Sequence, residues 1–217
     1  MSLIEDVVPH PILVDEERIA YLKNQIDYWS REIDNEKAKG AWIESFSGLR
    51  VYPLAMTEKM VVIEDIAHAL SMKCRYGGHC LKFISVAEHS VYVANVLAQM
   101  DKLELIKWGL FHDAAEAYLP DVARPIKDHI QGFRAIEQQC ERAIADKFNL
   151  CPKYIPKDVK HVDTSVLYRE KEVVMRDGPE WSKVDVIPLP DLEIHCWTPE
   201  EAEEQFMLMF NRLFRSN

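Results

Sequence analysis

The sequence predicts an all-α protein: a bundle of helices with an extra N-terminal helix and, at the C-terminus, a loop followed by a closing helix. Three observations predict this class. Glycine contributes only 7 of 217 residues while 48% are hydrophobic, a composition that favours packed helices. Apolar residues recur at helical spacing in several segments. The stretch richest in β-type residues, 49–56, contains Pro53 and should form at most a short edge hairpin.

Local signals predict the individual helices. Helical patterns cover residues 15–40, 63–72, 86–100, 103–119, 131–148, 157–175 and 199–213. Ser85 opens an S-x-x-E pattern that is typical of a capping box. Thr198 is a cap candidate, and the proline that follows it falls in the first helical turn. Residues 176–197 are punctuated by prolines and are expected to run as an extended loop over the surface.

The length of the chain is enough for one sizeable core, so we expect a single domain over residues 1–217. Residues 1–45 should form a helical appendage, 68–175 the core that carries the candidate metal site, and 176–217 the surface loop and closing helix. The apolar stripe of the appendage consists of Ile19, Leu22, Ile26 and Trp29. Because this stripe has no evident partner in the chain, we expect a homodimer or a higher homo-oligomer.

Charge and cysteine content exclude some classes of function. A formal net charge of −10 gives no basic surface for a nucleic-acid polymer, so an anionic substrate would need local cations or a metal ion. Five cysteines without regular spacing are typical of a reducing compartment. The start of the sequence has no basic leader, and no apolar run approaches 18 residues. We therefore expect a cytoplasmic protein that does not bind membranes.

Four ionisable residues stand within apolar, helix-forming stretches: His89, His112, Asp113 and Asp163. A buried charge is unfavourable unless it is paired or bound to a metal ion. Each residue taken alone is more often a structural histidine or a solvated acid. Together they make a set of two histidines and two carboxylates, which suits Mn, Co, Fe or Zn. We expect one such ion, with coordination positions left open for water and substrate.

Two further acids follow the His-Asp pair. Glu116 comes four residues after His112 and three after Asp113, which on a continuous helix places all three on one surface. A carboxylate there could hold or deprotonate a water molecule that the ion has made more acidic. The alternative is an exposed partner in an i,i+4 pair. Asp121 follows the break at Pro120 and is expected to face the same cavity, as a second proton carrier or a substrate contact.

Taken together, these motifs resemble those of the HD-domain metal-dependent phosphohydrolases. The pattern H…HD…D is carried by His89, His112–Asp113 and Asp163. The likeness is greatest to the bacterial YfbR-like 5′-deoxynucleotidases and to related phage deoxynucleotide triphosphohydrolases that act on dATP. In that group the HD pair continues as HDxxE, then an Asp, then Pro-x-Lys. Here the chain reads HDAAE, then Asp121, then Pro125-Ile126-Lys127.

The segment before the first ligand extends the resemblance. SVAEHS, at 85–90, matches the V-[SA]-E-H-S segment of the family. Upstream of it the family carries an Arg followed by an aromatic residue, which hold phosphate and sugar or base. Arg75 and Tyr76 stand in that place, with Tyr76 where relatives often have Trp. The resemblance covers roughly residues 68–175, about half of the chain.

The resemblance implies a nucleotide hydrolase, most closely a 5′-deoxynucleotidase that releases phosphate from deoxynucleoside 5′-monophosphates. Glu116 would orient or deprotonate the attacking water. Arg75 and Lys127 would neutralise charge on the phosphate, since Arg suits a bidentate contact and Lys a point charge. Tyr76 would stack on or wall off the sugar. Asp121 would touch the sugar or protonate the leaving 5′-oxygen.

Three other functions stay open at this point. The first is a deoxynucleoside triphosphate triphosphohydrolase, and the second is a non-catalytic binding module. The third is a di-iron HD-domain oxygenase with extra histidines, for which the candidates are His68, His129 and His161. His129 lies only two residues past Lys127, which is too close for the usual extra ligands. Residues 74–80, CRYGGHC, hint at a zinc knuckle, but no second pair of ligands lies at finger spacing.

Overall fold

The computed structural model describes residues 19–20, 23, 26, 40–181 and 183–214. The chain divides into two compact units, Met1–Gly40 and Ala41–Asn217. In the first unit residues 19, 20, 23 and 26 are helical, and two residues of the predicted stripe, Ile19 and Ile26, are exposed. The rest of the helix predicted over 15–40 lies outside the described residues.

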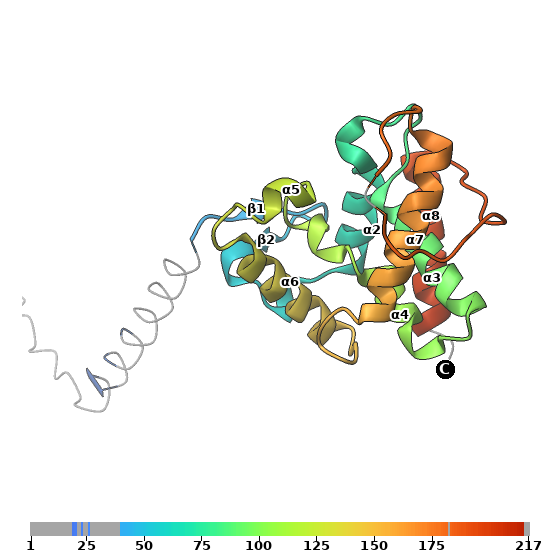
Figure 1. The fold of residues 1–217 in the computed structure, drawn as a ribbon. Helices are drawn as coiled ribbons and strands as arrows, with labels where there is room; N and C mark the ends of the chain where they lie inside the picture. Colours follow the sequence, from blue (N-terminus) through green and yellow to red (C-terminus); the bar gives the residue numbers. More distant parts are fainter. Residues whose placement is uncertain (1–18, 21–22, 24–25, 27–39, 182, 215–217) are drawn as a thin grey trace, which may run out of the picture. The chain divides into compact units, whose positions relative to one another are not determined.

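The second unit is all-α, as predicted (Figure 1). Its helices are α2 (Ile63–Met72), α3 (Val86–Gln99), α4 (Ile106–Phe111), α5 (Arg124–Lys127), α6 (Phe133–Lys147), α7 (Lys157–Val174) and α8 (Pro199–Phe214). Short 3-10 helices are η1 (Pro53–Ala55), η2 (Glu58–Met60), η3 (Arg75–Gly78), η4 (Leu103–Leu105) and η5 (Ala114–Ala117). Among the described residues the only sheet is an antiparallel hairpin of β1 (Ile43–Glu44) and β2 (Arg50–Val51), in which Ile43 pairs with Val51. This confirms the short hairpin expected beside Pro53.

Helix α3 packs against α2, α4, α7 and α8 in the right-hand part of this unit (Figure 1). Eleven of its 14 residues are buried, which is typical of a helix that is surrounded on all sides. Gly109 of α4 permits an unusually close approach, because a Cβ atom there would lie 2.6 Å from Cδ1 of Leu97 and 2.9 Å from the Cα of Ala94. The close contact brings the end of α4, and with it His112, beside His89 of α3.

The S-x-x-E pattern that begins at Ser85 lies at the N-terminus of α3. Ser85 caps the helix, since its hydroxyl accepts a hydrogen bond from the backbone N–H of Glu88 at 3.0 Å. The Glu88 carboxylate accepts hydrogen bonds from the backbone N–H groups of Cys196 and Trp197, at 2.8 and 2.9 Å. The serine half of the predicted capping box is therefore confirmed, whereas the Glu88 carboxylate anchors the end of a distant loop to α3 in place of bonding back to Ser85.

That loop, over residues 176–197, has no helix or strand among its described residues, as predicted. Apolar side chains along it pack against the core: Ile187, Leu189, Leu192 and Ile194. Helix α8 then begins with a reciprocal capping box. The N–H of Glu201 donates to Oγ1 of Thr198 at 3.3 Å, and the N–H of Thr198 donates to Oε2 of Glu201 at 2.9 Å.

The continuous helix predicted over 103–119 is wrong. Helix α4 ends at Phe111, Asp113 leaves the helical conformation at φ −103° and ψ 10°, and a separate 3-10 helix follows. The imidazole of His112 explains the break. Its Nδ1 donates a hydrogen bond to the carbonyl of Gly109 at 2.8 Å, which is the carbonyl that the N–H of residue 113 would use in a longer helix.

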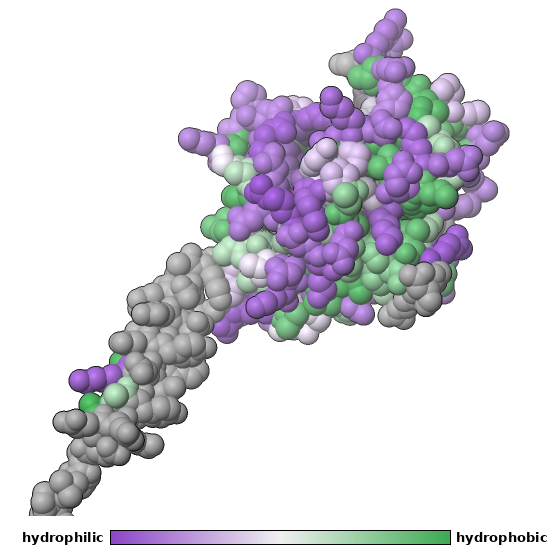
Figure 2. Space-filling model, turned by 90° about the horizontal axis from the view of Figure 1, so that it is seen from below, coloured by the Kyte–Doolittle hydropathy of each residue, from purple (hydrophilic) through white to green (hydrophobic). Residues whose placement is uncertain are grey.

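Figure 2 shows one face of the molecule, on which hydrophilic residues cover broad areas and hydrophobic residues lie in smaller groups between them. Such a mixed surface is ordinary for a folded domain, because polar groups alone do not cover it. Within the described parts of the chain, no helix has both the length and the apolar character needed to span a membrane.

Candidate metal centre

Three of the four side chains predicted to bind a metal ion bring their donor atoms together, and the fourth lies beside the two histidines. His89, His112 and Asp113 each offer a donor atom within 4.8 Å of the others, and the Nε2 atoms of the two histidines are 3.2 Å apart. Asp113 Oδ2 lies 3.3 Å from Nε2 of His112. Asp163 of α7 approaches with Oδ1 at 3.0 Å from Nε2 of His89 and at 3.8 Å from Nε2 of His112. The structure thus brings together all four side chains, from α3, the end of α4 and α7.

The donor set and its spacing fit a metal ion. Two imidazole nitrogens bound to one ion at about 2.1 Å would lie roughly 3.0–3.4 Å apart for angles between octahedral and tetrahedral. The separation of 3.2 Å between the Nε2 atoms falls within that range. Mixed nitrogen and oxygen donors suit Mn, Co, Fe and Zn. The buried group of His89, His112 and Asp113 could therefore hold a metal ion.

Glu170, which the sequence analysis missed, sets the orientation of His89. Nδ1 of His89 donates a hydrogen bond to Oε1 of Glu170 at 2.8 Å, so that Nε2 faces the other ligands. Both side chains are fully buried. Burial alone would raise the pKa of Glu170, but Arg75 and His89 outweigh it and lower the pKa. A carboxylate behind a ligand histidine fixes its tautomer and makes it a stronger donor.

A signal for Glu170 was present in the spacing. Glu170 lies seven residues after Asp163, which on α7 is two turns along the same face. The sequence of α7 contains several other acids, however, and burial alone separates Glu170 from them. Its role thus follows from tertiary packing.

His112 is oriented by the backbone. Its hydrogen bond to the Gly109 carbonyl directs Nε2 to the cluster. Burial acts to lower the pKa of His112, but the Asp113 carboxylate, together with Asp163, outweighs burial and raises the pKa to about 9. The two histidines therefore present the same atom to the site, one fixed by a carboxylate and the other by a neutral carbonyl.

Arg75 and Tyr76, the predicted substrate contacts, lie on the Glu170 side of the cluster. Nε of Arg75 donates to Oε2 of Glu170 at 2.9 Å, and its Nη1 lies 3.7 Å from Oδ2 of Asp113. The hydroxyl of Tyr76 donates to the carbonyl of Leu167 at 3.1 Å and reaches Oε2 of Glu170 at 3.2 Å. Both side chains thus hold Glu170 in place, and a direct contact with substrate stays a prediction.

A cavity of about 430 Å³ opens beside the cluster and is lined by His112, Asp113 and Asp163. We name it the charged cavity, because its other lining residues include three acids and four bases. These are Glu116, Glu137, Glu141, Arg124, Lys127, Arg134 and Lys160. The cations lie where an anionic group could reach them and the metal ligands together.

Glu116 reaches the charged cavity although the helix predicted for it is broken. In a 3-10 helix residues i and i+3 eclipse one another, so Asp113 and Glu116 still share one side. Burial, followed by the charges of Asp113 and Asp121, raises the pKa of Glu116 to about 8. Nζ of Lys127 lies 2.6 Å from Oε1 of Glu137. Asp121 is exposed and is not among the lining residues.

The other histidines and the cysteines that the structure describes form no comparable group. Nδ1 of His68 lies 3.0 Å from Oε2 of Glu203, and His129 is exposed. The Sγ atoms of Cys74 and Cys80 are 3.5 Å apart. Within the part of the chain that the structure describes, His89, His112 and Asp113 are the only set of three or more metal-ligand side chains.

Fold and site together define an all-α protein with a buried histidine–aspartate group that could hold a metal ion. The chain is 32% identical over 175 residues to the uncharacterized protein YfdR of Escherichia coli (strain K12), a match that covers 80% of this chain and 96% of YfdR. It is 30% identical over 192 residues to the uncharacterized protein RCAP_rcc00048 of Rhodobacter capsulatus. This match covers 82% of this chain and 98% of RCAP_rcc00048. No family model matches the chain. The chain belongs to the family of YfdR.

Proposed function

We propose that this chain is a metal-dependent phosphohydrolase of the HD-domain type that releases phosphate from deoxynucleoside 5′-monophosphates. One observation carries the proposal: His89, His112, Asp113 and Asp163 converge beside a cavity that is also lined by four cations. The order of these ligands in the chain is that of the HD-domain motif. A divalent ion held by them would act as a Lewis acid and lower the pKa of water.

Glu116 is the proton acceptor in this proposal. It lines the same cavity as His112 and Asp113, where an attacking water would have to lie. Burial and the neighbouring charges of Asp113 and Asp121 raise its pKa, which makes its carboxylate a stronger proton acceptor. A phosphate group bound to an ion that Asp113 helps to hold would also lie near the guanidinium group of Arg75. Glu170 already holds this guanidinium group in place.

The charged cavity is lined by four basic side chains and, when Asp113 and Asp163 are included, by five acidic ones, so a phosphate group would depend on the bound ion as well as on these cations. Lys127 and Lys160 line the cavity from α5 and α7, so they approach it from different elements. Positive groups fixed before substrate binds stabilise the charge that develops on a phosphoryl group. We propose that Lys127 makes the phosphate contact, with Glu137 positioning its ammonium group.

Phosphate release tests this proposal. The purified chain is incubated with each deoxy- and ribonucleoside 5′-monophosphate in the presence of Mn, Co or Zn. We expect orthophosphate from at least one deoxynucleotide, and loss of the activity when a chelator removes the ion. A chain that binds metal yet releases no phosphate from any nucleotide would contradict the proposal.

A triphosphohydrolase is the second candidate, favoured by the number of cations. Arg124, Lys127, Arg134 and Lys160 line the charged cavity from α5, α6 and α7, so a chain of phosphate groups could contact more than one of them. Product analysis by ion chromatography separates the two reactions. A 5′-nucleotidase gives orthophosphate from a monophosphate, whereas a triphosphohydrolase gives tripolyphosphate from a deoxynucleoside triphosphate.

We also propose that the chain works as a homodimer or a higher homo-oligomer. The support is the apolar pattern in the sequence of the first unit, of which Ile19 and Ile26 are exposed. Light scattering on the purified chain, with Ile26→Lys as the disrupting variant, measures the mass directly. A monomeric wild type would contradict the proposal.

A further inference from the structure

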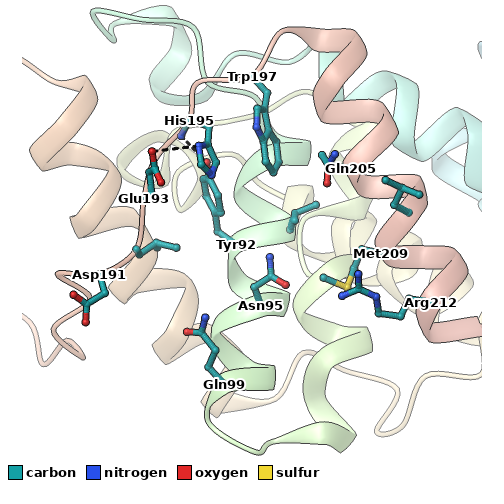
Figure 3. Close-up of a pocket in the computed structure, with 13 residues that line it drawn as sticks. Tyr92, Asn95, Gln99, Asp191, Glu193, His195, Trp197, Gln205, Met209 and Arg212 are labelled. Carbon is teal, nitrogen blue, oxygen red and sulfur yellow. Dashed lines mark hydrogen bonds and ion pairs between the residues drawn. The ribbon is translucent and has the colours of Figure 1, made fainter.

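A second cavity, of about 530 Å³, lies between α3, α8 and the end of the loop over 176–197 (Figure 3). Three rings meet at one end of it. Trp197 and His195 stack with centroids 5.4 Å apart and planes at 11°, and Tyr92 lies 5.6 Å from Trp197. Figure 3 shows the Trp197 ring projecting into the space between the loop and α8. We name this space the aromatic cavity.

Carboxamide groups line the aromatic cavity beyond the rings. Asn95 and Gln99 come from α3, and Gln205 comes from α8 (Figure 3). Asn95 and Gln205 are only partly exposed. Among the described residues, none of the three has a hydrogen-bond partner for its side chain. Each carboxamide offers two donors and one acceptor, so the cavity presents unused groups of both kinds.

The charges of the aromatic cavity argue against an anionic ligand. Its charged lining residues are Asp191, Glu193 and Arg212, that is, two acids and one base. The ring of His195 is 3.8 Å from Oε1 of Glu193. Arg212 is the single base of this lining, against four in the charged cavity, and the candidate metal ligands lie elsewhere. A phosphate group would meet at least as much negative as positive charge.

The floor of the aromatic cavity is apolar. Val91 and Met209 are buried, and Leu192 of the loop is half-buried. A cavity of this volume with apolar walls and a few convergent polar groups is typical of a small-molecule site. Its ligand must combine a flat ring for Trp197 with hydrogen-bonding groups in the ring plane for the carboxamides.

We propose that the aromatic cavity binds an uncharged nucleoside or nucleobase. The base would stack on the Trp197 ring, as bases stack on aromatic side chains elsewhere. Asn95 and Gln205 would pair with the ring nitrogens and exocyclic groups, because a carboxamide matches the paired donor and acceptor of a base edge. The proposal concerns binding alone and does not depend on catalysis at the charged cavity.

Isothermal titration calorimetry on the full chain tests the proposal, with adenosine, guanosine, cytidine, uridine and their deoxy forms as probes. We expect at least one to bind with a Kd below about 1 mM. Trp197→Leu should weaken binding by about 5-fold or more through loss of stacking. Asn95→Ala and Gln205→Ala should each weaken it about 2- to 10-fold through loss of hydrogen bonds. Alanine is favourable within a helix, so both carboxamide variants should fold.

The matched control is Gln138→Ala, which removes an exposed carboxamide from α6 and should leave binding unchanged. Thermal unfolding of Trp197→Leu shows whether that variant is folded. The matching 5′-monophosphate should bind the aromatic cavity more weakly than its nucleoside. Failure of every probe to bind, or binding that Asn95→Ala, Gln205→Ala and Trp197→Leu all leave intact, would overturn the proposal.

Discussion

The charged cavity and the aromatic cavity belong to one small domain but present opposite chemistry. The charged cavity combines His112 and Asp113, which could help to hold a metal ion, with four cations, whereas the aromatic cavity combines rings with neutral carboxamides. Helix α3 contributes residues to both sites: His89 to the candidate metal site, and Tyr92 and Asn95 to the aromatic cavity. The difference shows that the local set of side chains, and not the net charge of the chain, decides what each site can bind.

The two sites also differ in how their polar groups are satisfied. In the candidate metal site both histidine rings are held in one orientation, His89 by Glu170 and His112 by the Gly109 carbonyl. In the aromatic cavity Asn95 and Gln205 have no partner among the described residues. Fixed ligands are suited to an ion with strict geometry, while free carboxamides can adjust to a ligand. Substitutions should therefore affect one site without the other.

Asp113→Ala is expected to give the largest difference between the two sites. Loss of this carboxylate removes a ligand and leaves its neighbour His112 without its charge partner, so bound metal and phosphate release should both disappear. Nucleoside binding at the aromatic cavity should persist. Metal analysis and calorimetry on the same sample measure both effects.

The control for Asp113→Ala is Asp146→Ala, which removes an exposed acid whose Oδ1 lies 3.1 Å from Nζ of Lys153 on the surface. It should retain metal and activity. An Asp113→Ala variant that keeps its metal and its activity would show that Asp113 is not a ligand of the ion.

Glu116→Gln is expected to separate chemistry from metal binding. Glutamine keeps the size of the side chain but cannot accept a proton, so phosphate release should slow by about 10²- to 10⁴-fold. Metal should stay bound, because the four ligands are unchanged. Unchanged turnover, measured at saturating substrate, would rule out Glu116 as the proton acceptor.

Glu170→Gln should weaken metal binding by about 10- to 100-fold, the usual cost of losing a carboxylate behind a ligand histidine. The expected cause is a less strongly oriented and less basic His89. Glu172→Gln is the matched control on α7, since Glu172 is exposed and only pairs with Arg169. Equal metal affinities for the two variants, measured by competition with a chelator, would show that Glu170 has no part in the site.

The pH dependence of the metal-free protein gives the smallest expected effect. The pKa of His112 is raised from 6.5 to about 9 in the fold, so its contribution to the free energy of unfolding is complete below pH 6.5 and is lost as pH rises through about 9. Urea unfolding of wild type and His112→Asn across this range measures it. Metal affinity should change in the opposite direction and rise with pH, because the ion competes with protons.

Local signals made most helices predictable from the sequence. Ser85 and Thr198 both cap helices in the structure, because capping depends on residues within one turn. The end of α4 was not predictable in this way. Apolar residues continue past Phe111, and the break depends on a side-chain hydrogen bond from His112 to Gly109 that periodicity does not report.

The candidate metal site and the aromatic cavity also differ in how far the sequence predicts them. The predicted ligands His89, His112, Asp113 and Asp163 form an ordered motif, and the structure places their side chains near one another. Glu170 carries no motif, because only burial by surrounding helices distinguishes it from other acids of α7. The aromatic cavity is assembled from residues 91–99, 191–197 and 205–212, which no short-range pattern connects.

Anomalous diffraction from crystals grown with Mn²⁺ shows whether the four side chains hold an ion. We expect one strong peak per chain, bounded by Nε2 of His89, Nε2 of His112 and carboxylate oxygens of Asp113 and Asp163. A map with no peak among these atoms, or with the ion held elsewhere while the four side chains bond only to one another, would contradict this expectation.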